Sequence, residues 1–188
     1  LSILYKHVRF SSACDFGAGV GTWLRAAYTL GAHDLHGIEG EWVRNVPDRF
    51  GHASYTFADL NQPISIVRQF DIAISVEVAE HLLPERSDDF VSEICNASAT
   101  VVFGAALPRQ GGTGHINCRP HSYWAELFDR SGYECLDTFR PATWYDREVE
   151  PWYSQNTYLF VRRPVPEVFS AIPKALLFDV YHPLLVNE

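Results

Sequence analysis

The stretch CDFGAGVGTW, residues 14–23, decides the fold class because three glycines join a short apolar run to a helix-like segment. The glycines stand at every second position, at Gly17, Gly19 and Gly21. A glycine-rich turn between a first strand and a first helix lets a ligand approach the backbone, where the helix start offers free N–H groups. The stretch therefore predicts a nucleotide-like ligand at the edge of an α/β sheet.

The spacing of these glycines excludes two common nucleotide sites. A dinucleotide fingerprint of the form GxGxxG requires glycine at position 22, where this chain has Thr22. The phosphate-binding pattern GxxxxGK[ST] is absent from the sequence. A dehydrogenase site and a P-loop are thus both disfavoured.

Outside this stretch, strand-like runs alternate with helix-like runs along the chain. The helical patterns fall at 22–30, 85–98 and 121–133. The strand-like runs cover residues 11–16, 33–39, 53–57, 70–76, 99–107, 134–140 and 157–163. Regular alternation predicts an α/β fold, in which a mainly parallel sheet carries helices on both faces.

Composition describes an ordinary globular chain with an acidic surface. Hydrophobic residues make up 47% of the 188 residues and charged residues 20%, and no apolar run approaches the ~20 residues that span a bilayer. Fifteen basic against 23 acidic side chains give a net charge of −8, and there is no basic tract. We expect one soluble domain without a membrane partner, and the charge argues against nucleic acid as a partner.

Cysteine and methionine usage bears on the compartment and on the parent chain. Four cysteines show no CxxC spacing, which favours reduced thiols in a cytoplasmic protein. The sequence holds no methionine, so we expect a domain of a longer chain or a processed product. Residues 1–163 are expected to form the domain, and 164–188 a proline-containing extension that is a lid, a packing arm or a linker.

Three acidic residues stand at the ends of three successive predicted strands. Glu39 lies 22 positions after Gly17, where a carboxylate can accept both hydroxyls of a ribose. Asp59 follows the third strand and can accept from an adenine amino group, and Glu77 follows the fourth. Each acid alone is commonly a helix cap or a solvated loop residue. Together with the glycines, they indicate one ligand site at the carboxyl edge of the sheet.

Over residues 11–163 the chain resembles the class I S-adenosylmethionine-dependent methyltransferases. The matching segments are DFGAGVG, GIEG, ADL and FDIAISVEVAEHL. The resemblance implies a Rossmann-like sheet of seven strands, the last antiparallel, and S-adenosyl-L-methionine as cofactor. It implies that Asp15, Gly17 and Gly19 hold the methionine part, Glu39 the ribose, and Asp59 and Leu60 the adenine. Only ten residues precede the first strand, so the usual N-terminal substrate cap is missing or lies elsewhere in a parent chain.

The segment EVAEHL carries a candidate metal site. On a helix that begins after the fourth strand, Glu77, Glu80 and His81 fall at i, i+3 and i+4 and share one face. His115, in the loop GGTGHINCRP after the fifth strand, can supply a fourth ligand. Carboxylate oxygens and imidazole nitrogens suit a divalent cation such as Mg²⁺ or Mn²⁺.

This ExxEH pattern resembles the metal site of small-RNA 3′-terminal 2′-O-methyltransferases and a motif of the ubiquinone-pathway catechol O-methyltransferases. Both families act on neighbouring hydroxyls, and a cation that chelates a vicinal diol lowers the pKa of one hydroxyl. The alternative is a metal-independent enzyme in which His81 or His115 acts as general base. Asn117, Arg119 and His121 share the loop and either touch substrate or form its scaffold.

Residues 111–133 and 152–160 are similar to bacterial and viral methyltransferases of glycan synthesis, whose domains are often fused to glycosyltransferases. We therefore expect O-methylation of a sugar or glycan, which supplies a vicinal diol. A 2′-O-methyltransferase of an RNA 3′ end and a small-molecule methyltransferase remain alternatives. A non-catalytic module that only binds cofactor or a partner is a fourth interpretation, which the complete set of cofactor and polar residues disfavours.

Overall fold

The computed structural model describes residues 1–186 and contains one seven-stranded sheet with the order β3-β2-β1-β4-β5-β7-β6. Apolar, β-branched and aromatic residues dominate the central strands, which are buried on both sides. The strands are β1 (Ser12–Phe16), β2 (Asp34–Glu39), β3 (Ser54–Phe57), β4 (Ile72–Val76), β5 (Thr100–Gly104), β6 (Tyr133–Leu136) and β7 (Thr157–Arg162).

Strand direction confirms the predicted methyltransferase-type sheet. The first five strands pair in parallel. The last strand, β7, is antiparallel to both β5 and β6. The carboxyl ends of β1, β2 and β4 therefore meet at one edge, which is where ligands bind in open α/β sheets.

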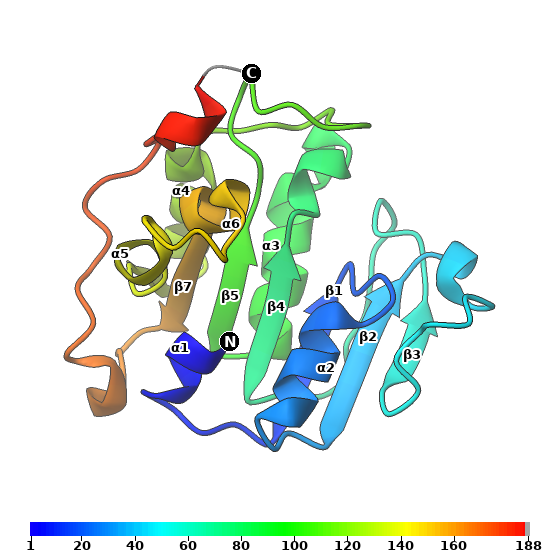
Figure 1. Cartoon of the computed structure of the whole chain (residues 1–188). Coiled ribbons are helices and arrows are strands. Elements are labelled where there is room, and N and C mark those ends of the chain that lie inside the picture. The colour runs from blue at the N-terminus through cyan, green and yellow to red at the C-terminus, as the bar shows by residue number, and fades with distance from the viewer. Residues whose placement is uncertain (187–188) are drawn as a thin grey trace.

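Helices cover both faces of the sheet, as the sequence predicts. In Figure 1, α3 and α4 lie behind the strands, whereas α1, α2 and α6 lie in front of them. The α-helices are α1 (Ser2–Tyr5), α2 (Thr22–Thr29), α3 (Ser87–Ala97), α4 (His121–Arg130), α5 (Arg140–Thr143) and α6 (Pro151–Asn156). Short 3-10 turns are η1 (Glu41–Val43), η2 (Ala79–His81), η3 (Pro84–Arg86), η4 (Glu167–Phe169) and η5 (Pro183–Leu185).

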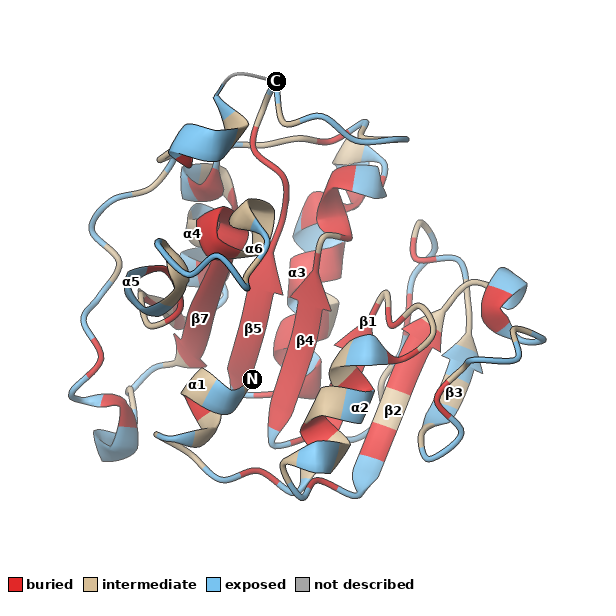
Figure 2. Ribbon diagram, in the orientation of Figure 1, coloured by how far each residue is buried: buried red, intermediate tan, exposed pale blue. Residues whose placement is uncertain are grey.

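Two apolar clusters hold these layers together, one on each face. The first contains Phe90 of α3 and Trp124 and Phe128 of α4, and the second contains Leu4 of α1 and Leu24 of α2. Figure 2 shows the buried residues concentrated in the central strands and on the helix faces turned toward them. Burial of these faces is the main source of stability for the sheet edge that carries the site.

Two predicted strands are shorter in the structure. The predicted strand 99–107 ends at Gly104, and the predicted strand 134–140 ends at Leu136, because the chain turns there and begins α5 at Arg140. The short helix α6 was not predicted as a helix, and it directly precedes β7.

Residues 164–186 pack along the domain. Phe169 and Ile172 are buried in the second apolar cluster. Lys174 forms an isolated antiparallel bridge with Leu136, and Asp137 donates its N–H to the Pro173 carbonyl at 2.9 Å. The described part of the extension is thus a packing arm. Among residues 1–186, no helix has both the length and the apolar character that crossing a bilayer requires.

Candidate active site

The glycine loop after β1 requires glycine for two different reasons. Gly17, Gly19 and Gly21 have φ values of +83°, +52° and +89°, a left-handed backbone that is costly for other residues. At Gly17 a Cβ would also collide with the side chain of Val78, whereas at Gly19 the space is open. The loop therefore brings β1 close to the residues that follow β4.

Glu39, at the end of β2, fixes this loop. Its Oε2 accepts a hydrogen bond from the Gly19 N–H at 2.8 Å. Its Oε1 accepts from the Gly40 N–H at 2.7 Å and from Trp42 Nε1 at 3.1 Å. A carboxylate offers about four acceptor positions, and three are used here, so Glu39 keeps capacity for about one further hydroxyl donor.

A cavity of about 510 Å³ opens at this edge of the sheet. Four of the six predicted cofactor residues line it, namely Gly17, Glu39, Asp59 and Leu60. Two of the four predicted metal residues, Glu77 and His81, line the same cavity, whereas Glu80 and His115 do not.

The other two predicted cofactor residues, Asp15 and Gly19, do not line this cavity. Asp15 lies beneath the loop, is 1% exposed, and leaves Oδ2 without a hydrogen-bond partner among the described residues. Burial, with a smaller contribution from the charge of Glu39, raises the pKa of Asp15 to about 8. Asp15 is therefore a structural neighbour of the ligand space rather than part of its wall.

The predicted helix that places Glu77, Glu80 and His81 on one face is wrong. Glu77 has a φ of +59°, a conformation that a right-handed helix cannot contain. Its N–H donates to the Gly104 carbonyl at 2.9 Å, which extends the pairing of β4 with β5 by one residue. Only a 3-10 turn, η2, follows. A left-handed residue other than glycine costs about 1–2 kcal/mol, and such strain is concentrated at functional sites.

The structure nevertheless brings three of the four predicted metal ligands together. Ligand atoms of Glu80, His81 and His115 all lie within 4.8 Å of one another. The loop that carries His115 is anchored on the η2 turn, because the N–H groups of Ile116 and Asn117 both donate to the Glu80 carbonyl at 2.9 Å. Glu77 stands outside this three-residue group.

Glu80 provides the physical reason to expect a cation. Its side chain is 0% exposed, and neither carboxylate oxygen makes a hydrogen bond of ordinary geometry among residues 1–186, although the Glu77 carboxylate and the Ala106 N–H approach it. Burial and the neighbouring charge of Glu77 raise the pKa of Glu80. A buried carboxylate without donors is costly unless a proton or a cation compensates it. The donor set of one carboxylate and two imidazoles therefore fits a divalent cation.

The two histidines approach each other closely, with ring centroids 4.8 Å apart. His81 Nδ1 lies 3.3 Å from the Gly114 carbonyl, a contact that places the proton on Nδ1 and leaves Nε2 to bind. At Gly112 a Cβ would collide with the His115 ring, so the glycines of this loop make room for the imidazoles. Burial and the nearby His81 lower the pKa of His115, which keeps its imidazole neutral.

Glu77 is held by two amide side chains that sequence reasoning did not single out. Asn156 Nδ2 donates to Glu77 Oε1 at 2.8 Å, and Gln110 Nε2 donates to Oε2 at 3.2 Å. Burial raises the pKa of Glu77, and these two hydrogen bonds oppose the shift. Asn156 lies 79 positions away in the sequence, and no local pattern announces the pairing.

The remaining loop candidates are placed as follows. Asn117 is 2% exposed and donates to the Ala79 carbonyl at 3.2 Å and to Ser87 Oγ at 3.0 Å, so it is scaffold. His121 is 3% exposed, and burial lowers its pKa to about 4. Arg119 is half-buried and donates to Asn117 Oδ1 at 2.9 Å.

Among the comparisons with known proteins, the one with solved structures supports the fold. No protein-family model matches the chain, and no curated protein sequence does. Solved structures that match include the small RNA methyltransferase HEN1, with a TM-score of 0.62 and 15% identity over 96% of this chain and 26% of that one. A magnesium protoporphyrin IX methyltransferase from Synechocystis PCC 6803 with bound SAM matches with a TM-score of 0.58 and 15% identity over 86% and 74%.

A third similar structure is the complex of DhpI with SAH. It matches with a TM-score of 0.55 and 17% identity over 80% of this chain and 76% of that chain. At these identities the likeness establishes the fold, a Rossmann-like methyltransferase sheet, and a fold alone does not determine the chemistry of its site.

Proposed function

We propose that this chain is an S-adenosylmethionine-dependent O-methyltransferase that uses Mg²⁺ or Mn²⁺ to methylate one hydroxyl of a vicinal diol. The observation that carries the proposal is the buried, unpartnered carboxylate of Glu80 beside His81 and His115. His81 also lines the cavity formed by the glycine loop and Glu39.

The cofactor residues fit S-adenosylmethionine, whose sulfonium supplies an activated methyl group for in-line displacement. Gly17 leaves the loop backbone open toward the cavity, and Glu39 offers carboxylate oxygens at the end of β2. Asp59 and Leu60 form the wall after β3, where an adenine would lie. Asp59 Oδ1 accepts from the Asn61 N–H at 2.9 Å, which leaves Oδ2 for an amino group.

Glu80, His81 and His115 are the residues that would hold the cation, and Glu77 is the nearest further carboxylate. A divalent cation there supplies a Lewis acid that lowers the pKa of a coordinated hydroxyl. Glu80 contributes the negative charge, and the two imidazoles contribute neutral nitrogens. The amides of Asn156 and Gln110 hold the Glu77 carboxylate at the same edge of the sheet.

A metal-independent mechanism remains the second candidate. The lowered pKa of His115 leaves a neutral imidazole that can accept a proton from a hydroxyl. In that case Glu80 carries no buried negative charge, because its raised pKa keeps the carboxyl group protonated.

The acceptor we propose is a sugar or glycan, with a glycosyltransferase domain as fusion partner or working partner. A net charge of −8 does not oppose binding of a neutral polyol, but it disfavours binding of an RNA end, whose phosphates are negatively charged. The RNA alternative is favoured by one observation, the structural similarity to HEN1 over 96% of this chain. A 2′-O-methylation assay on short RNA, run beside a glycan panel, separates these two acceptors.

The experiment that tests the metal is the substitution His115→Ala, with the exposed His33→Ala as matched control. Loss of a cation ligand should lower turnover by about 100-fold or more while the affinity for S-adenosylhomocysteine stays near that of the native chain. Chelator should abolish activity, and added Mg²⁺ or Mn²⁺ should restore it. Full activity in chelator, together with an inactive His115→Ala variant, would instead assign His115 as general base.

A further inference from the structure

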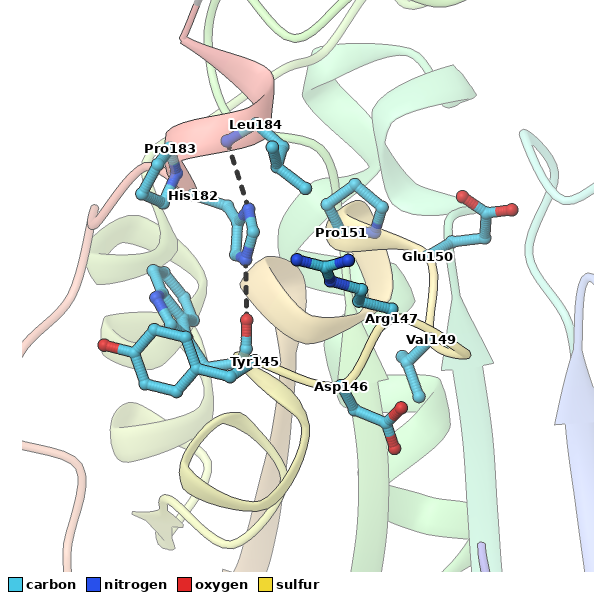
Figure 3. A pocket seen from close by; sticks show the side chains of 10 residues that line it. Tyr145, Asp146, Arg147, Val149, Glu150, Pro151, His182, Pro183 and Leu184 are labelled. Atoms are coloured by element: carbon cyan, nitrogen blue, oxygen red, sulfur yellow. Dashed lines mark hydrogen bonds between the residues drawn. The ribbon is translucent and has the colours of Figure 1, made fainter.

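A second cavity, of about 630 Å³, lies between the loop that joins α5 to α6 and the end of the packing arm. Figure 3 shows its walls, which come from residues 144–147 and 149–151 on one side and His182, Pro183 and Leu184 on the other. We propose that this cavity binds a sugar ring that carries a carboxylate, as part of the acceptor glycan. The inference rests on the proposed function and narrows the acceptor from any sugar or glycan to a glycan that contains a carboxylate-bearing sugar.

Aromatic side chains give the cavity faces on which a sugar ring can stack. Tyr145 is 92% exposed, a large aromatic side chain left open to solvent beside the cavity. The Trp144 ring lies 4.6 Å from the His182 ring, centroid to centroid. Tyr and Trp combine an apolar face with a polar group, which suits the alternating C–H and hydroxyl surfaces of a sugar.

Arg147 provides the guanidinium of the cavity lining, which also holds the carboxylates of Asp146 and Glu150. In Figure 3 its guanidinium extends toward His182, whereas the carboxylates of Asp146 and Glu150 point away from that centre. Within residues 1–186, Arg147 takes part in no ion pair. A guanidinium fork matches a carboxylate with two parallel hydrogen bonds, so a uronate is a better ligand than a neutral hexose.

The His182 wall is fixed by hydrogen bonds. His182 is 6% exposed, and its backbone N–H donates to Gln155 Oε1 at 2.7 Å. Its Nε2 lies 2.8 Å from the Trp144 carbonyl, while Nδ1 accepts from the Leu184 N–H at 3.3 Å. These contacts tie the packing arm to the loop after α5, so both walls of the cavity are held in place without a ligand.

The cavity lies close to the proposed reaction site, because α6 joins the two. Pro151 lines the cavity, and Asn156, at the other end of this helix, binds Glu77. At a rise of 1.5 Å per residue, these two positions are only about 8 Å apart along the helix axis. A smaller cavity of about 340 Å³ shares Val149 and Glu150 with it and reaches Val76, the last residue of β4. In this proposal the rest of the oligosaccharide lies along α6, between this cavity and Glu77.

The test uses calorimetric titration of the chain saturated with S-adenosylhomocysteine. The probes are a short oligosaccharide that ends in glucuronate and the same oligosaccharide with glucose in that place. We expect the glucuronate probe to bind about 10-fold more tightly, and Arg147→Gln to abolish the difference. Tyr145→Ala should weaken both probes several-fold. Arg130→Gln, a control at an exposed residue of α4 outside the cavity, should change neither.

Three outcomes overturn the inference. Equal affinity for the two probes, or native affinity in Arg147→Gln, refutes the charge preference. Binding of S-adenosylhomocysteine without binding of either probe refutes the sugar site and leaves the methyltransferase proposal standing. Failure of the native, folded chain to bind S-adenosylhomocysteine refutes the proposed function itself, and this inference falls with it.

Discussion

Replacement of Glu39 by glutamine tests whether the carboxylate oxygens of this residue bind the cofactor. Oε2 of Glu39 accepts from the Gly19 N–H, and Oε1 accepts from the Gly40 N–H and Trp42 Nε1. A glutamine amide has one oxygen, so it cannot accept on both sides at once. In the less costly orientation, the oxygen stays with Gly40 and Trp42, and the Gly19 N–H loses its acceptor.

The expected loss of binding free energy comes from the ribose contact, because the chain makes the Gly19 hydrogen bond with or without ligand. A hydrogen bond to a charged group contributes about 1.5–3 kcal/mol, and Glu39 is half-buried, which favours the lower value. The amide also presents an N–H₂ where a ribose hydroxyl would donate, so we expect a loss of binding free energy of about 1.5–3 kcal/mol. This corresponds to roughly 10- to 100-fold weaker binding of S-adenosylhomocysteine.

Calorimetric titration of Glu39→Gln measures this loss directly. Glu41→Gln is the matched control, because Glu41 is an exposed carboxylate two positions on that pairs with Arg44 and does not line the cavity. Native affinity in a folded Glu39→Gln variant would show that the ribose lies elsewhere. The assignment of the cavity after β2 would then be wrong.

Three further predictions concern the loop, the carboxylate at the end of β4 and the buried acid. Gly17→Ala should lower the free energy of unfolding by at least about 1–2 kcal/mol in chemical denaturation, because its φ is left-handed and a Cβ would collide with Val78. The control Gly51→Ala, which has open space around the added Cβ, should leave the free energy of unfolding unchanged. Asn156→Ala removes a hydrogen bond that lowers the pKa of Glu77. The acid limb of the pH–turnover profile should therefore move to higher pH, while the affinity for S-adenosylhomocysteine stays unchanged. An unchanged pH profile would argue against the role of Asn156. Asp15 has a folded-state pKa of about 8 against about 3.9 unfolded, so its contribution to stability is lost as the pH rises through this window. Thermal melts of Asp15→Asn should therefore show a smaller decline than the native chain between about pH 4 and 8.

The sheet and the cofactor edge could be predicted from the sequence because their signals are local. Apolar runs mark the strands, and the spacing of Gly17, Gly19 and Gly21 marks the first turn. Acids at strand ends must lie at one edge once the strands are parallel, which is why Glu39 and Asp59 could be placed together.

The geometry after β4 could not be predicted, because it depends on distant partners. Residues 77–81 read as a helix start, but pairing of the Glu77 N–H with Gly104 imposes a left-handed residue there. The amide of Asn156 that orients Glu77 comes from an unpredicted helix 79 positions away. Long-range contacts of this kind leave no periodic trace in the sequence.

The position of the packing arm could not be predicted from the sequence either. Its prolines disfavour a long helix or a central strand, but they do not predict which part of the domain the segment packs against. Its position is set by single contacts, such as the hydrogen bond between the His182 N–H and Gln155.

A crystal structure of the chain with S-adenosylhomocysteine and Mn²⁺, solved with anomalous data, tests the proposed function most directly. We predict the ribose hydroxyls against Glu39 and one anomalous peak bound by Glu80, His81 and His115, at ordinary metal–ligand distances of about 2.0–2.3 Å. Electron density for the ligand without an anomalous peak among these three residues, at saturating Mn²⁺, would contradict the metal-assisted mechanism. A ligand bound outside the cavity after β2 would contradict the assignment of the site as a whole.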